Sequence, residues 1–249
     1  MQTDLNEKTA LVIGATGALG TAVCRQLAGS GARVAGDYQD PELARACRDE
    51  LARDQVLVEL YAADLADLTG CADLVAAVER DLGPIDIVVN ALDFEQPARF
   101  RDMDKSQWDR TLGVNLDNVF NICRQVVAGM GSRGYGRIVN IASVISRQGE
   151  AGHSHYAAAK AGVHGFTMAL AQELARNGVT VNTVSPGYLD EHLPQSLTEE
   201  QRQALIARIP AARLGRADEL ACLVDFLCSD QAGFITGADI AINGGQYMH

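Results

Sequence analysis

The sequence has no cluster of basic residues and no long apolar run. It contains 21 Lys and Arg against 32 Asp and Glu, which gives a formal net charge of −11. A chain of this sign without a basic patch is unsuited to nucleic acid or to an anionic membrane surface. No apolar stretch approaches the roughly 20 residues of a membrane-spanning helix, and residues 1–14 lack the basic start of an export signal. The composition therefore predicts a cytoplasmic protein that binds neither nucleic acid nor membrane.

Cysteine pairs and interdomain linkers are absent as well. The six cysteines form no CxxC motif, most fall within apolar helical patterns, and a reducing compartment disfavours disulfides. Buried free thiols are therefore expected at Cys24, Cys47, Cys71, Cys123, Cys222 and Cys228. No stretch rich in proline, serine or charge, and no internal repeat, interrupts the chain. Residues 1–249 are predicted to form one domain.

Short apolar runs alternate with amphipathic segments along the chain. The runs predict strands at 9–14, 32–36, 56–62, 85–91, 137–143, 179–185 and 238–243. Helices are predicted at 18–30, 41–53, 67–82, about 105–130, 154–177 and 217–229. Near-continuous β-branched runs separated by helices are typical of parallel strands covered on both faces. We predict an α/β fold, a single-domain Rossmann-type doubly wound parallel sheet flanked by helices.

Two segments depart from this simple alternation. Residues 188–215 follow a strand as a long excursion, and such excursions are often lids over a binding site. We therefore interpret 188–215 as a substrate lid. The helix at 154–177 is small and apolar around much of its circumference, which is more than one sheet face requires. A second copy of the chain is expected to cover it, so the protein is predicted to be a homo-oligomer.

The first predicted strand runs directly into the glycine-rich segment GATGALG, residues 14–20. Glycines let the backbone approach a pyrophosphate closely, and the start of the following helix offers unpaired N–H groups to an anion. A plain tight turn would also explain three glycines, but a strand, a glycine turn and a helix in this order favour dinucleotide binding. The cofactor-binding residues predicted here are Gly14, Thr16, Gly17, Ala18, Leu19 and Gly20.

Acidic residues follow the second and third predicted strands. Asp37 lies about twenty residues beyond the glycines, where a carboxylate can accept hydrogen bonds from the adenosine ribose and repel a 2′-phosphate. This position favours NAD(H), with NADP(H) as the less favoured cofactor; the alternative is a solvated loop aspartate. Asp64 is a further candidate for the adenine edge.

Tyr156 and Lys160 are four residues apart on the predicted helix 154–177. Side chains at this spacing share one helical face, so the ammonium can lie beside the phenol. A nearby cation stabilises a phenolate and brings its pKa closer to the working range of a general acid. The pair taken alone is also compatible with coincidence on a surface helix.

Further motifs carry a family resemblance. GATGALG, RIVNIASV (137–144), HYAAAKAG (155–162), VNTVSPGY (181–188) and GADIAINGG (237–245) occur in this order. Together they resemble the short-chain dehydrogenase/reductase family over nearly the whole chain, and segments 165–188 and 233–245 are most similar to its acetoacetyl-CoA reductases.

The resemblance implies a catalytic tetrad of Asn115, Ser143, Tyr156 and Lys160. Ser143 would hydrogen-bond the substrate carbonyl while Tyr156 delivers the proton. Lys160 would lower the pKa of the phenol and hold the nicotinamide ribose, and Asn115 would anchor a water behind it. Further cofactor contacts are implied at Leu65, Asn90, Ala91, Pro186 and Gly187. The predicted substrate-binding residues are Ser143, His153, Tyr156 and Tyr188.

Three positions depart from the family pattern. Ala18 stands where a glycine is usual, with Ile13 before Gly14 in place of a threonine, so we expect altered cofactor affinity. Ala91, Leu92 and Asp93 replace Asn-Ala-Gly, and Glu191 replaces a threonine that binds the nicotinamide carboxamide. We expect these changes to affect the placement of the nicotinamide.

The substrate loop before Tyr156 also differs from that of acetoacetyl-CoA reductases. It contains His153 and His155, which are two residues apart with no further ligand cluster, so a metal site is not predicted. His153 is interpreted as a polar contact near the substrate carbonyl.

The resulting hypothesis is NADH-dependent reduction of a 3-oxoacyl thioester, with acetoacetyl-CoA giving (3R)-3-hydroxybutyryl-CoA, by a homotetramer. A second hypothesis keeps the tetrad and changes the substrate to an acyl-carrier-protein thioester or another ketone. A third is a non-catalytic nucleotide-binding subunit. The order and register of the tetrad favour an enzyme.

Overall fold

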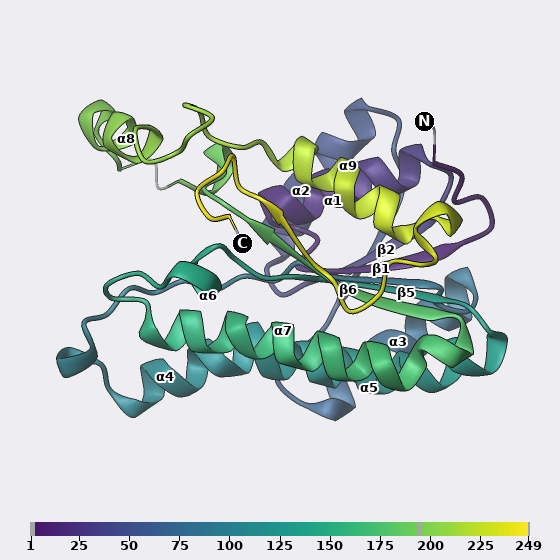
Figure 1. Cartoon of the computed structure of the whole chain (residues 1–249). Helices are drawn as coiled ribbons and strands as arrows, with labels where there is room; N and C mark the ends of the chain where they lie inside the picture. Colours follow the sequence, from purple (N-terminus) through teal and green to yellow (C-terminus); the bar gives the residue numbers. More distant parts are fainter. Residues whose placement is uncertain (1–2, 194–195, 249) are drawn as a thin grey trace.

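Seven short segments pair in one parallel sheet, and four of them are buried along their whole length, as expected of strands covered by helices on both faces. The computed structural model describes residues 3–193 and 196–248, and Figure 1 shows the sheet between two helical layers. The strands are β1 (Thr9–Ile13), β2 (Arg33–Tyr38), β3 (Val58–Ala62), β4 (Ile87–Asn90), β5 (Gly136–Ile141), β6 (Val179–Pro186) and β7 (Asp239–Ile242). Their order, β3-β2-β1-β4-β5-β6-β7, confirms the predicted doubly wound α/β fold.

Helices cover both faces of the sheet (Figure 1). One layer holds α1 (Ala18–Gly29), α2 (Pro41–Arg53) and α9 (Ala217–Cys228). The other holds α3 (Leu68–Leu82), α4 (Lys105–Leu112), α5 (Asn118–Arg133) and α7 (Ser154–Leu174). The short helix α6 (Ile145–Gln148) follows β5, and α8 (Glu199–Ile206) stands away from the sheet.

The hydrophobic core is divided by the sheet into two clusters. Ala10 and Val12 of β1 belong to the cluster under α1 and α9, while Leu11 and Ile13 belong to the cluster under α3, α5 and α7. This division follows from the two-residue period of a strand, which sends successive side chains to opposite faces. Each fully buried Leu or Ile contributes about 1.5–3 kcal/mol relative to an exposed one.

The helix predicted over about 105–130 is interrupted in the structure. A π-helical turn, Gly113–Asp117, separates α4 from α5. A turn of this type inserts an extra residue into the helical ladder and often marks a functional position. Its central residue, Asn115, is 1% exposed, so the insertion directs an amide side chain into the protein interior. The apolar pattern alone indicated a continuous helix.

Residues 188–215, predicted as a lid, contain a short 3-10 turn (Asp190–His192) and α8. A capping box begins α8: Thr198 Oγ1 accepts from the Gln201 N–H at 3.2 Å, and Gln201 Oε1 accepts from the Thr198 N–H at 2.9 Å. Pro194 and Gln195 of this segment lie outside the described residues.

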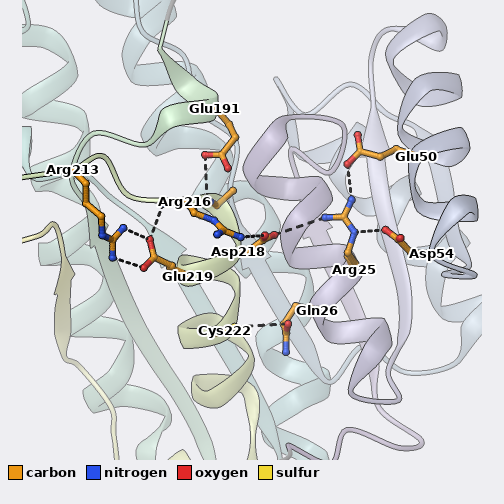
Figure 2. Close-up of polar contacts among 11 residues, drawn as sticks. Arg25, Gln26, Glu50, Asp54, Glu191, Arg213, Arg216, Asp218, Glu219 and Cys222 are labelled. Atoms are coloured by element: carbon orange, nitrogen blue, oxygen red, sulfur yellow. Dashed lines mark hydrogen bonds and ion pairs between the residues drawn. The ribbon is translucent and has the colours of Figure 1, made fainter. Parts of the chain in front are cut away.

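All six cysteines are free thiols, and five of them are buried. Cys222 is exposed, which corrects the prediction of burial at that position. It lies on α9 with its Sγ 3.9 Å from Gln26 Oε1 on α1, at the margin of the contact between these two helices (Figure 2). Burial raises the pKa of Cys71 to about 11 and that of Cys123 to about 12, so these thiols stay protonated at neutral pH.

Candidate active site

The carboxyl ends of β1, β4, β5 and β6 open at the same edge of the sheet. The chain order reverses between β1 and β4, and in a doubly wound sheet a ligand binds at such a switch point. The glycine turn follows β1, residues 91–95 follow β4, Ser143 follows β5, and Gly187 and Tyr188 follow β6. The fold therefore brings most of the predicted site residues to this edge.

The glycine turn depends on two close backbone contacts. Gly14 has φ +81°, and a Cβ there would lie 2.8 Å from the Cα of Leu92. A Cβ on Gly20 would lie 2.0 Å from the Gly14 carbonyl oxygen. Neither position therefore accepts a side chain without a backbone shift. Gly17 and Ala18 are exposed, so the additional methyl of Ala18 is accommodated without burial.

The start of α1 is suited to an anion. Gly17 is the N-cap residue, and no side chain caps the first turn. The N–H groups at the start of a helix have no partners within it, so those of Ala18, Leu19 and Gly20 point towards the turn with a positive dipole end behind them. Thr16, at the tip of the turn, is half-buried. The residues present thus fit the pyrophosphate of a dinucleotide.

Asp37 has a different orientation from the one expected at the ribose. It is 3% exposed, and its Oδ1 accepts a 2.6 Å hydrogen bond from the Gly14 N–H. Burial raises the pKa of this carboxyl, while backbone hydrogen bonds from Gly14 and Ala15 lower it. The side chain therefore braces the glycine turn from behind. Tyr38, the next residue, is half-buried at the strand end.

A shallow hollow beside β2 and β3 is the candidate adenosine site. Its lining includes Tyr38, Gln39 and Asp64. Asp64 Oδ1 accepts from the Ala66 N–H at 3.0 Å, so the carboxylate also fixes its own turn. Leu65 is buried, and its carbonyl oxygen accepts from Asn121 Nδ2 at 3.2 Å.

Tyr156 and Lys160 lie on one face of α7, as their spacing predicted. Both are buried, with 3% and 1% exposure, and the Lys160 Nζ is 5.6 Å from the centre of the Tyr156 ring. Lys160 Nζ also donates a 3.1 Å hydrogen bond to the carbonyl oxygen of Ile141, the last residue of β5. The sheet edge thereby holds the ammonium beneath the phenol.

Asp93 contacts both members of this pair. The Tyr156 hydroxyl donates to Asp93 Oδ1 at 2.9 Å, and Lys160 Nζ lies 3.0 Å from the same oxygen. Asp93 stands in the segment that departs from the family pattern, and this contact was not foreseen. Its signal in the sequence was a carboxylate directly beyond a strand that ends at the site.

The environment of Tyr156 opposes ionisation of its phenol. Burial raises the pKa well above its ordinary value, and the charges of Asp93 and Glu95 raise it further. The hydrogen bond with Ser143 acts in the opposite direction. The sequence had suggested that Lys160 lowers this pKa. In the structure the shift is upwards, since burial disfavours the phenolate and Asp93 brings a negative charge between the two groups.

Ser143 and Asn115 support the site from two sides. Ser143 Oγ accepts from the Ile145 N–H at 3.2 Å and hydrogen-bonds with Tyr156. Asn115 clamps the backbone of Phe94: its Nδ2 donates to the Phe94 carbonyl at 2.8 Å, and its Oδ1 accepts from the Phe94 N–H at 3.2 Å. The π-helical turn thus fixes the segment that carries Asp93.

A cavity of about 390 Å³ lies in front of Tyr156. Ser143, His153 and Tyr188, which the sequence analysis predicts to bind the substrate, line it. Its lining also includes three carboxylates and several leucines: Asp93, Glu95, Glu150, Leu189, Leu193, Leu197 and Leu205. The leucines come from the segment 188–215, which therefore forms one apolar wall.

Two polar pairs, neither expected from the sequence, form part of the lining of this cavity. His153 Nε2 is 2.6 Å from Glu95 Oε1, and the Tyr188 hydroxyl donates to Glu150 Oε2 at 2.9 Å. The bond to Glu150 contributes, after burial, to raising the pKa of Tyr188 to about 12. Glu95 and Glu150 lie in loops and carry no motif, so no pattern in the sequence marked them.

The remaining predicted cofactor residues divide into two groups. Ala91, Pro186 and Gly187 line the cavity. Asn90 does not contact it through its amide, since Asn90 Nδ2 donates to Asn140 Oδ1 at 2.8 Å inside the sheet. Its side chain ties β4 to β5 and fixes the position at which residue 91 leaves the sheet.

Glu191 faces a helix rather than the cavity (Figure 2). Its Oε2 accepts a 3.2 Å hydrogen bond from the Ala217 N–H at the start of α9, where a carboxylate complements the helix dipole. The neighbouring ion pairs of Arg25 with Glu50 and Asp54, at 2.5 and 2.8 Å, connect α1 to α2. Figure 2 also shows Asp218 of α9 approaching Arg25, so these ion pairs connect α1, α2 and α9.

The two histidines considered as metal ligands have separate partners. His155 Nε2 lies 3.0 Å from the Gln96 carbonyl oxygen, whereas His153 faces Glu95. Within residues 3–193 and 196–248, no group of three or more His, Cys, Asp or Glu side chains is placed to hold a metal ion. No helix in that part of the chain is long and apolar enough to cross a membrane.

The fold and the site define an α/β protein with a glycine turn after its first strand and a buried tyrosine–lysine pair at the carboxyl edge of its sheet. The family model described as enoyl-(acyl carrier protein) reductase matches residues 14–247. The chain is 41% identical over 244 residues to acetoacetyl-CoA reductase of Allochromatium vinosum, covering 97% of this chain and 99% of that protein. It is 44% identical over 243 residues to nodulation protein G of Azospirillum brasilense, covering 97% and 98%.

A third relative is 3-oxoacyl-(acyl-carrier-protein) reductase of Escherichia coli, 37% identical over 241 residues, with 97% of this chain and 98% of that protein covered. These similarities extend over the whole sheet and its helices. The chain therefore belongs to the short-chain dehydrogenase/reductase family and is an oxidoreductase that uses a nicotinamide dinucleotide.

Proposed function

We propose that this protein reduces the 3-keto group of a 3-oxoacyl thioester, with acetoacetyl-CoA as substrate and (3R)-3-hydroxybutyryl-CoA as product. The observation that carries the proposal is that Ser143 and Tyr156 line one cavity at the carboxyl edge of the sheet, with Lys160 held beside Tyr156 by the Ile141 carbonyl oxygen. The similarity to proteins named acetoacetyl-CoA reductase supports the choice of thioester. The apolar wall from residues 189–205 suits a short acyl chain.

The cofactor site is assigned to the glycine turn and the strand ends. The amides of Ala18, Leu19 and Gly20 would bind the pyrophosphate, and Lys160 would hold the nicotinamide ribose. When bound, the reduced nicotinamide supplies a hydride to the keto carbon. Tyr156 supplies the proton for the resulting alkoxide, and Ser143 hydrogen-bonds the same oxygen. The buried, neutral phenol is the form required of the acid in this direction.

We propose NADH as the preferred cofactor. Support comes from the hollow beside β2 and β3, whose lining Tyr38, Gln39, Ala62, Ala63 and Asp64 contains no Lys or Arg. A 2′-phosphate there would meet Asp64 without a cation to neutralise it. Asp37 adds a second carboxyl beneath the turn. The proposed cause of the NADH preference is therefore repulsion of the 2′-phosphate. It is not a contact of Asp37 with the ribose, since the Asp37 side chain points towards the Gly14 N–H.

We also propose that residues 188–215 act as a lid and that the protein is a homo-oligomer, a tetramer by family resemblance. Leu193, Leu197 and Leu205 of the lid face the cavity. The outer surface of the long helices leaves large apolar side chains exposed: Phe120 of α5 at 48% and Met168 of α7 at 50%. A second copy covering this surface would remove them from water.

The test is a spectrophotometric assay with acetoacetyl-CoA that follows oxidation of NADH and NADPH in parallel. The expected result is turnover with NADH that exceeds turnover with NADPH and is lost in Tyr156→Phe. Turnover with a carrier-protein thioester but not with the CoA thioester would instead assign the second substrate class. Equal efficiency with both cofactors would contradict the proposed preference.

A non-catalytic nucleotide-binding role is the second candidate function. It is favoured by one observation, the contact of Asp93 with both Tyr156 and Lys160. The same assay separates it from the first: tight NADH binding, no turnover on any ketone and no effect of Tyr156→Phe on binding would support the non-catalytic role.

A further inference from the structure

Asp93 contacts the two groups through which the proposed catalytic pair would act, the Tyr156 hydroxyl and Lys160 Nζ. Its Oδ1 is 2.9 Å from the Tyr156 hydroxyl and 3.0 Å from Lys160 Nζ. A phenol has one hydrogen to donate, and here that hydrogen is directed at Asp93. The hydroxyl can serve a substrate oxygen only after this bond is broken. In the observed arrangement the Tyr156 hydroxyl is therefore not positioned to donate to a substrate oxygen.

The backbone around Asp93 is fixed on both sides. Leu92 lies against the glycine turn, where a Cβ on Gly14 would be 2.8 Å from its Cα. Phe94 is held through both its N–H and its carbonyl by Asn115. A large displacement of the segment would break both contacts. Rotation of one side chain would break neither.

The Asp93 side chain has space to rotate. It is 35% exposed and lines the cavity in front of Tyr156. Lys160, by contrast, is 1% exposed and is bonded to the Ile141 carbonyl. Of the two partners in this ion pair, the carboxylate is thus the one that faces the cavity and solvent.

We propose that Asp93 is a positioning residue that competes with the cofactor for Lys160 and Tyr156 and rotates away when the nicotinamide ribose binds. This inference rests on the proposed roles of Tyr156 and Lys160. Binding then includes the cost of separating a part-buried, charge-assisted contact. The native protein therefore binds the cofactor less tightly than the glycine turn and the strand ends alone would allow. The Tyr156 hydroxyl is separated from Asp93 only when the cofactor site is occupied.

The test is NADH affinity measured by fluorescence titration in the absence of any ketone. Asp93→Ala is expected to bind NADH at least about tenfold more tightly, because a hydrogen bond to a charged group no longer has to be broken. Asp93→Asn is expected to tighten binding less, since its amide oxygen still accepts from both partners. The control is Asp102→Ala, at an aspartate 62% exposed on the turn Phe100–Asp102, with affinity within about twofold of native. Unchanged or weaker binding by a folded Asp93→Ala would overturn the proposal.

A second readout covers the case in which Asp93→Ala fails to fold because Lys160 loses its counter-charge. The ultraviolet absorbance of tyrosinate is titrated in native protein and in Asp93→Asn, and Tyr156→Phe versions identify the signal of this phenol. The midpoint for Tyr156 is expected at lower pH in Asp93→Asn, since a negative charge is removed from its hydroxyl. An unchanged midpoint would overturn the proposal.

Neither readout uses a thioester, so the two proposals can fail separately. Tighter NADH binding by Asp93→Ala with no reduction of any thioester would leave this inference standing and reject the proposed function. Reduction of acetoacetyl-CoA with no gain in affinity would do the reverse. If both the proposed function and the role of Asp93 hold, the KM for NADH should be lower in Asp93→Ala than in the native protein.

Discussion

The two ends of the proposed cofactor site differ in where the side chains that depart from the family pattern point. At the pyrophosphate end, Ala18 replaces a glycine, but its methyl is exposed, and the close contacts fall on Gly14 and Gly20. At the nicotinamide end, Asp93 replaces a glycine and reaches both Tyr156 and Lys160. A substitution beside a ligand site is therefore neutral or consequential according to where its side chain points.

Glu191 belongs with the neutral substitutions although it lies at the nicotinamide end. Its carboxylate bonds to the first turn of α9 and thus serves the scaffold. Asp37 is similar, since it supports the glycine turn from within. Among these acidic residues, only Asp93 touches the acid–base pair.

The largest expected effect is at the acid itself. Tyr156→Phe should lower kcat by at least about 100-fold, the lower end of the contribution of a general acid, with the fold retained since only a hydroxyl is removed. Steady-state kinetics measures the loss of kcat, and far-ultraviolet circular dichroism checks that the fold is retained. Retained activity would show that the proton comes from another group and would remove the significance of the Asp93 contact.

The contrast at the pyrophosphate end can be tested with two single-methyl changes. Gly20→Ala forces a Cβ to within 2.0 Å of the Gly14 carbonyl oxygen, and such overpacking costs about 1–3 kcal/mol. Ala18→Gly removes an exposed methyl and should cost no more than about 1 kcal/mol in helix propensity. Chemical denaturation and NADH titration of both variants are the measurements. Similar effects of the two changes would contradict the assigned close contacts.

Two substitutions of Asp37 form a matched pair, with an expected effect on stability of intermediate size. Asp37→Ala leaves the part-buried Gly14 N–H without its acceptor, which costs about 1–3 kcal/mol. Asp37→Asn keeps an oxygen at that position and removes the charge, so stability should be largely retained. If the charge contributes to cofactor choice, Asp37→Asn should also narrow the preference for NADH over NADPH. Equal destabilisation by both variants would argue against the hydrogen bond as the cause.

The rate of reduction should depend on pH in a direction set by Tyr156. The protonated phenol is the active form in reduction, and its pKa is raised above the ordinary value. The rate should therefore be flat through neutral pH and fall only on the alkaline side, as the phenol loses its proton above its usual pKa of about 10. A profile of kcat/KM for NADH against pH, which reports on groups of the cofactor-free protein, measures this, and a falling limb near pH 7 would contradict the assigned environment.

The smallest effect is expected at Glu191. Glu191→Ala removes one acceptor from the start of α9 and should lower Tm by at most about 3 °C without changing the affinity for NADH. Differential scanning fluorimetry and the same titration measure both. A large loss of affinity would place this residue at the cofactor after all.

The fold was largely predictable because it depends on average properties of whole segments. The strand runs and the helices at 18–30 and 41–53 follow from burial and periodicity, and the structure confirms them within a residue or two. The π-helical turn at Asn115 was not predictable in this way, since one inserted residue barely alters the apolar pattern.

Side-chain direction was the main part that the sequence left open. Spacing from the glycines identified Asp37 but not the face of β2 from which it projects, and it shares the face of Ala35, towards α3 and α5. Spacing on a helix did fix the direction of Tyr156 and Lys160, because a helix determines which side chains are neighbours. Residue 93 lies in a loop, where no period specifies direction, so its contact emerges only from the three-dimensional structure.

The central claim is that the pair of Tyr156 and Lys160 performs chemistry although Asp93 holds it in the cofactor-free protein. The most direct measurement is chromatographic identification of the product after the purified protein is incubated with NADH and acetoacetyl-CoA. We predict 3-hydroxybutyryl-CoA, formed in one-to-one proportion to the NADH consumed and absent with Tyr156→Phe. Recovery of unreacted acetoacetyl-CoA, from a protein that binds NADH, would contradict the claim.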